Sequence, residues 1–256
     1  MERRSFLKGL SVFGLAAAAG AGGLLVYSNR ALGQVPAPSV DLKEGWEKID
    51  EKTGTVFERD FGVIKVKANQ HLVQYEDQAI REKIRKGTLG AVDTPIALFF
   101  ASKINTNINL EQIPLIKNEV ISQAKKQAKN SLLDRLKEYG IKEIKKTKSR
   151  DLDLEINKKI NLSVFKGYYP IEKVKFDLKD KDLNFSGSKL KMTAYLGAWT
   201  YNGYILIAGG VHPSQDYEKT YNKEITDLIN MTLKLDLGLK PNKTKNEILS
   251  QIQSTT

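Results

Sequence analysis

Apolar residues recur along this chain with two periods, one typical of helices and one typical of strands. Between Leu115 and Tyr139 the spacing is three and four residues, which predicts a long helix with one buried face, and Gly140 then marks its end. Similar spacing predicts a second helix over Tyr217–Leu233 and a short polar helix over Gln78–Lys86. We therefore expect helical layers beside a sheet.

Strand patterns fill most of the remaining sequence. Runs rich in β-branched and aromatic residues predict strands within Trp46–Asp77, Ala91–Ala101, Ile141–Arg150, Lys159–Gly167, Val174–Leu178 and Leu190–Val211. Asn202-Gly203 interrupts the last segment and predicts a hairpin, because both turn positions need positive φ. The run after it, Tyr204–Ala208, lacks polar alternation and should be a central strand covered on both faces. The pattern predicts an α+β fold, with an antiparallel sheet of about six strands sandwiched by helices.

Composition along the chain predicts four segments. We assign 1–33 to a leader or membrane anchor, 34–45 to a linker, 46–236 to a single α+β domain and 237–256 to a polar C-terminal tail. The linker assignment rests on two prolines, small residues and little charge at its start. The tail is expected to be frayed, with one short amphipathic turn at Ile248, Leu249 and Ile252.

The leader has the features of a twin-arginine export signal. Its motif consists of Arg3, Arg4, Phe6, Leu7 and Lys8. An uncharged stretch over residues 9–27 follows, and small residues at 31 and 33 would allow cleavage before residue 34. An uncleaved anchor is the alternative, since the stretch approaches the ~20 residues that span a bilayer. Because this route carries folded proteins, we expect a protein that is secreted or membrane-anchored on the outer face of the cytoplasmic membrane.

Charge and cysteine content narrow the function classes. The formal net charge is +11, and removing the leader would take away four cations and one acid, so the remaining chain stays basic. A positive chain is drawn to anionic lipids, glycans or acidic proteins, and nucleic acid is a less suitable partner for an exported protein. The absence of cysteine excludes disulfides and thiolate metal sites.

The order of elements resembles the PsbP-like fold, best known from extrinsic subunits of the photosynthetic oxygen-evolving complex. The resemblance rests on the early hairpin, the strand Ala91–Ala101, the long helix, the segment Gly167-Tyr168-Tyr169 and the hairpin Ala194–Gly210 followed by a final helix. The chain also resembles an uncharacterised family of exported archaeal proteins, through Thr94-Pro95 and Gly209–Pro213. Both resemblances imply a sheet between helices and neither supplies a catalytic motif. Halophilic archaeal members would be acidic, and this chain departs from them.

Common catalytic motifs are missing from the sequence. A nucleophile elbow, a phosphate-binding glycine loop, a dinucleotide fingerprint and a paired-histidine zinc motif are all absent, so we predict no catalytic residues, no cofactor and no metal. His71 and His212 could still meet in space and form a metal site with carboxylates. Asp180, Asp182 and Asn184 have calcium-loop spacing, although a polar hairpin loop explains them better.

Two clusters are candidate binding sites. Cations gather at Lys142, Lys145, Lys146, Lys148 and Arg150, and could dock to an anionic surface. Lysines on an edge strand also prevent sheet aggregation, which is the structural alternative. Aromatic residues gather at Tyr168, Tyr169, Tyr195 and Trp199, and could form a ligand platform or simply cover one sheet face.

These observations favour an exported, non-catalytic accessory protein that docks to a membrane-associated protein or an anionic envelope component. The alternatives are a small-ligand-binding domain with a pocket between the long helix and the sheet, near Tyr169 and Trp199, and a metal-dependent enzyme.

Overall fold

A computed structural model describes residues 33–60, 65–87, 90, 93–178, 181–216, 218–226 and 229–256. The export motif and Asp180 lie outside the described residues. The described residues form an eight-stranded antiparallel sheet, a separate two-stranded ribbon and three α-helices, so the α+β class is confirmed. No helix in this part of the chain has the length and apolarity needed to span a membrane.

The strands and helices have the following bounds. The strands of the sheet are β1 (Trp46–Asp60), β2 (Lys65–Asp77), β3 (Leu98–Thr106), β4 (Lys142–Lys146), β5 (Arg150–Leu154), β6 (Lys158–Leu178), β7 (Lys181–Tyr201) and β8 (Tyr204–Pro213). The ribbon consists of β9 (Glu218–Thr226) and β10 (Ile229–Asp236). The helices are α2 (Gln78–Gly87), the short 3-10 helix η2 (Leu110–Gln112), α3 (Pro114–Glu138) and α4 (Pro241–Ser254).

The sheet has the order β1-β2-β3-β8-β7-β6-β4, and β5 pairs with β6 beside β4. It contains eight strands instead of about six, partly because the predicted strand Ile141–Arg150 is divided into β4 and β5 by residues 147–149. Strand β8 lies in the middle and residues 205–208 are buried, as predicted. Asn202 and Gly203 have φ values of 49° and 79°, and they form the predicted hairpin turn between β7 and β8.

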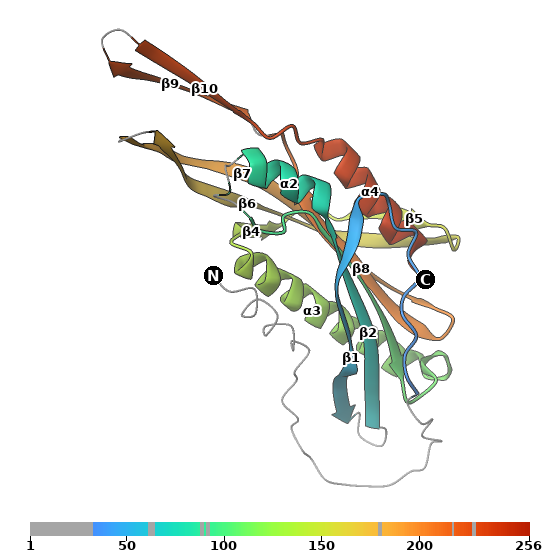
Figure 1. The fold of residues 1–256 in the computed structure, drawn as a ribbon. Coiled ribbons are helices and arrows are strands. Elements are labelled where there is room, and N and C mark those ends of the chain that lie inside the picture. Colours follow the sequence, from blue (N-terminus) through green and yellow to red (C-terminus); the bar gives the residue numbers. More distant parts are fainter. Residues whose placement is uncertain are drawn as a thin grey trace.

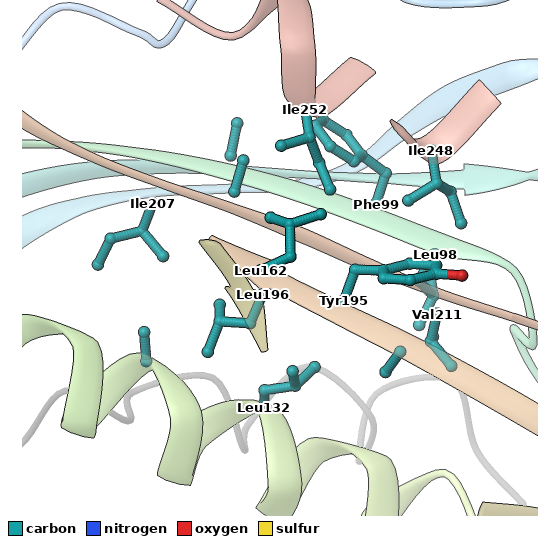
Figure 2. Packing of buried hydrophobic residues seen from close by; sticks show 14 of the residues in the cluster. Leu98, Phe99, Leu132, Leu162, Tyr195, Leu196, Ile207, Val211, Ile248 and Ile252 are labelled. Atoms are coloured by element: carbon teal, nitrogen blue, oxygen red, sulfur yellow. The ribbon is translucent and has the colours of Figure 1, made fainter. Parts of the chain in front are cut away.

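Two helices cover opposite faces of the sheet (Figure 1). Helix α3 packs against β7, β8 and β4, and helix α4 packs against β8, β5 and β3. Figure 2 shows Ile248 and Ile252 of α4 beside Phe99 of β3, with Leu132 of α3 on the other side of the sheet. Because β8 receives a helix on each face, its side chains are excluded from water on both sides.

The predicted helix Tyr217–Leu233 is wrong, because residues 218–226 and 229–236 form the ribbon of β9 and β10. Its sequence also alternates, with Ile229, Met231 and Leu233 separated by polar residues. Threonines, tyrosine and isoleucines in this segment favour strands. The helical spacing and the strand alternation coexist here, and the strand pattern prevails.

The predicted polar tail is also wrong, because residues 241–254 form α4, the second helical layer. Pro241 occupies the first turn, where a missing N–H does no harm. Ile248 and Ile252 are fully buried, and so is the polar residue Gln251. The amphipathic turn expected at residues 248–252 is thus part of a complete helix that seals the sheet.

The predicted linker is docked on the domain as well. The side chain of Val35 is buried, and its carbonyl oxygen lies 2.9 Å from Nδ1 of His71. Ser39 and Thr256 exchange two backbone hydrogen bonds of 2.8 and 2.9 Å, and the amide of Asp41 donates to Oγ of Ser254 at 3.0 Å. Residues 33–256 thus contain the sheet, both helical layers and a closure that joins the two ends of the domain.

Candidate docking surface

The five predicted docking cations lie at one edge of the sheet and are all exposed. Three of them belong to β4, the terminal strand in the sheet order, Lys148 lies in the following loop, and Arg150 begins β5. Lys142, Lys145 and Lys146 thus lie on an edge strand, and their docking role stays a prediction. Whether the five residues act together depends on which face of the sheet each of them occupies.

The strand register divides the cations between two faces. Lys145 lies opposite Lys166 of β6, Lys142 lies opposite Tyr168, and Lys146 lies opposite Phe165. Residues directly opposite one another share a face of the sheet. Lys142 and Lys145 therefore stand on one face and Lys146 on the other. Arg150, opposite Leu162, shares the face of Lys142 because Leu162 and Tyr168 are an even number of residues apart.

Three further lysines complete the cluster on this face. Lys191 of β7 lies opposite Tyr168, and Lys189 stands two residues earlier on the same strand. We call the set Lys142, Lys145, Lys166, Lys189 and Lys191 the basic face, and all five residues are exposed. The last three are absent from the predicted cluster because only the register brings them beside β4. In the sequence, these lysines alternate with the apolar residues Phe165, Leu190 and Met192, which is the pattern of a strand with one exposed face.

The basic face lies on the α4 side of the sheet. Lys191, Thr193 and Tyr195 alternate along β7 and so point the same way. Tyr195 pairs with Gly210, and a Cβ at Gly210 would come within 2.9 Å of Cγ2 of Ile248 in α4. The lysines therefore occupy the part of this sheet face that α4 leaves open.

A single acid lies within the basic face. Glu143 is the only Asp or Glu in residues 142–146, 158–171 and 189–201. It sits in a β-bulge between Lys142 and Lys145, with φ of 51°. Its Oε1 accepts a hydrogen bond of 3.2 Å from the Tyr168 hydroxyl and lies 4.0 Å from Nζ of Lys189. The bulge interrupts the β4 ladder and so protects this edge from pairing with another strand.

Tyr168 lies at the centre of the basic face. The ammonium of Lys189 lies 4.1 Å from the centroid of the Tyr168 ring, a cation–π contact, and Lys142 and Lys191 stand on its two neighbouring strands. Lys145 and Lys166 are directly opposite like charges, an arrangement that costs stability in a sheet. The face thus concentrates positive charge on a rigid support, with one carboxylate to offset it.

The four predicted platform aromatics do not form one platform. Tyr195 is 5% exposed and stacks on His212 at 5.8 Å, and Trp199 is 3% exposed, so both serve the core, as the alternative interpretation expected. Tyr169 lies on the opposite face, beside Gly140 at the end of α3. Only Tyr168 belongs to the exposed basic face.

The structure also contradicts the predicted pocket between the long helix and the sheet. Tyr169 and Trp199 occupy opposite faces, so they cannot line one pocket. The hollow between α3 and the sheet is lined by Leu136, Ile141, Phe165, Met192 and their neighbours and leaves no space for a water molecule.

The two histidines are too far apart to share a metal. His71 is in register with Lys103 and, through it, with Leu206, whereas His212 stands six residues further along β8, about 20 Å away. His71 contacts Oε1 of Glu51 at 2.6 Å. Within the described ranges no group of three His, Asp or Glu residues could hold a metal ion. Asp182 and Asn184 lie in the β7 ladder rather than in a loop.

His212 is buried beneath the end of the basic face. Its Nδ1 lies 2.6 Å from the carbonyl oxygen of Pro213, and Nε2 is buried without a partner among the described residues. Burial lowers the pKa of His212 to about 4, so the ring is neutral at physiological pH. It therefore adds no charge to the surface above it.

Comparison with known protein families assigns the chain to one family. The profile described as "Domain of unknown function (DUF6517)" matches residues 33–255. The chain belongs to the DUF6517 family. The matched range takes in the docked segment 34–45 and helix α4, so the DUF6517 domain extends beyond the predicted limits of 46–236 at both ends. No curated protein and no solved structure gave a significant match.

Proposed function

We propose that this protein is an exported, extracytoplasmic accessory protein that docks through its basic face to an anionic, membrane-associated partner or envelope component. The observation that carries the proposal is the concentration of five exposed lysines around Tyr168 with one acid among them. The predicted twin-arginine leader supplies the compartment, and the protein is then secreted or held at the outer face by a single N-terminal anchor. The domain acts by binding and carries out no catalysis.

The physical basis is electrostatic attraction to a surface of opposite charge. Each lysine close to an anionic surface contributes ~1 kcal/mol, and the attraction falls off within a Debye length of ~8 Å at physiological salt. The sheet backbone already holds the five lysines next to one another, so they can contact such a surface together without prior folding of this segment. Docking through this face should therefore weaken steeply as salt is added.

The resemblance to PsbP-like proteins stays a prediction. An antiparallel sheet with helices on both faces and an accessory role without catalysis are what that resemblance implies. The resemblance to exported archaeal proteins stays a prediction too, and it agrees with the proposed compartment.

The test is binding of residues 34–256 to the cell's own envelope fraction at low salt. A Lys145, Lys166, Lys189 and Lys191 to Gln variant should lose binding by at least roughly tenfold, since neutralised lysines lose their surface attraction. The matched control neutralises Lys125, Lys126, Lys129 and Lys137, four exposed lysines of α3. Equal loss in both variants would mean that net charge alone acts, and the proposal of a specific docking face would fail.

A further inference from the structure

The five lysines of the basic face come from β4, β6 and β7, three neighbouring strands of one sheet. Neighbouring strands lie ~4.8 Å apart, and alternate residues on one strand lie ~6.7 Å apart. The charges thus form a grid across the sheet surface. A grid of this kind can contact many anionic groups lying in one plane.

The chemistry of the cations favours a partner whose anionic groups have no fixed positions. The face is built from lysines, and Arg150 lies at its margin. Lysine presents a compact charge on a flexible stem, whereas planar bidentate recognition of carboxylates is the property of arginine. A face of lysines suits a surface whose anionic groups move laterally better than a protein with carboxylates at set positions.

Tyr168 adds an amphipathic residue at the centre of the grid. Tyr168 is half-buried, the ammonium of Lys189 lies over its ring, and its hydroxyl donates to Glu143. Tyrosine and lysine are both suited to the boundary between lipid headgroups and water. Their apolar parts contact the lipid and their polar tips stay in water. Lys189 covers one side of the ring, which argues against stacking of a sugar on that side.

We infer that the docking partner is the anionic phospholipid surface of a bilayer, with the basic face turned toward the headgroups. The inference rests on the proposed function and names its partner. In this orientation β4 and the lysine-bearing parts of β6 and β7 face the membrane. Glu143 then carries a negative charge that opposes binding.

The experiment measures sedimentation of residues 34–256 with vesicles of phosphatidylcholine, with and without phosphatidylglycerol at about one third of the lipid. Binding should require the anionic lipid. The Lys166→Glu and Lys191→Glu double variant should bind at least roughly 20-fold more weakly, since ~1 kcal/mol per lysine is about a fivefold factor for each. The Lys125→Glu and Lys129→Glu variant of α3 has the same net charge and should keep most of its binding.

Further measurements distinguish three causes of lost binding: misfolding of the variant, failure of the docking function and failure of the lipid inference. Urea midpoints of both variants should match that of the wild type, because every substituted residue is exposed. A Glu143→Gln variant with an unchanged urea midpoint should bind the vesicles several-fold more tightly, because it removes a carboxylate from the basic face. Binding to the envelope without binding to anionic vesicles overturns the lipid inference and keeps the docking function. Binding to neither overturns both, and equal loss in the two double variants overturns the assignment to this face.

Discussion

Replacing Ile252 with alanine tests whether α4 is a structural layer of the domain. The Ile252 side chain is fully buried and lies beside Phe99 on the sheet (Figure 2). The substitution removes three carbons, which lose about 2.4 kcal/mol at ~0.8 kcal/mol each, and the remaining cavity adds about 1 kcal/mol. We expect the free energy of unfolding to fall by about 3 to 4 kcal/mol, a large part of the stability of an ordinary domain.

The assay is equilibrium urea unfolding of residues 34–256, followed by tryptophan fluorescence. Trp46 suits this purpose because it is buried and its Nε1 donates to Glu247 of α4 at 3.3 Å. The matched control is Asn246→Ala, an exposed position of the same helix, which should change stability by no more than about 0.5 kcal/mol. A loss below about 1 kcal/mol for Ile252→Ala, with fluorescence changing separately from the main transition, would show that α4 is a detachable tail.

Two further predictions concern acid stability and the joined termini. Because the pKa of His212 is about 4 in the fold and 6.5 for an unperturbed histidine, the unfolded chain binds the extra proton as pH falls from about 6.5 to 4. Stability should therefore decrease over that window by about 3 kcal/mol, and a His212→Phe variant measured in parallel should lack this component. Deleting residues 254–256 removes the acceptors of the Ser39 and Asp41 amides, so hydrogen exchange at both should accelerate by roughly fivefold or more as bonds worth ~1 kcal/mol are lost. Unchanged exchange at Ser39 and Asp41, or a pH dependence of stability identical in wild type and His212→Phe, would contradict these two assignments.

The fold could be predicted from the sequence wherever local chemistry determined the result. Asn202-Gly203 sets its own turn, and the apolar run that follows it could only be a strand covered on both faces. Helix α3 could be predicted because apolar residues recur every four positions from Val120 to Leu136, and these residues are buried. The predictions that failed, at residues 218–226, 229–236 and 241–254, failed for other reasons. The first segment fits both the helical and the strand periodicity. The second segment is too polar to be predicted as core, and Gln251 and Thr244 are nevertheless buried in the folded domain.

Only part of the basic face could be predicted from the sequence, for the same reason. Lys142 and Lys145 lie in a short run of cations that any reading of the sequence finds. Lys166, Lys189 and Lys191 join them only through the pairing of β4 with β6 and of β6 with β7. The register between strands far apart in sequence depends on the whole sheet and cannot be read from a short segment. The same register places Lys146 on the opposite face.

Lysine footprinting of the envelope-bound protein tests the docking face most directly. Residues 34–256 are bound to the native envelope, exposed briefly to an amine-acetylating reagent and compared with the free protein by peptide mass spectrometry. Protection should be confined to Lys145, Lys166, Lys189, Lys191 and their neighbours at the sheet edge, while Lys125, Lys126 and Lys129 of α3 react as in the free protein. Protection of the α3 lysines with unchanged reactivity on the basic face would contradict the account.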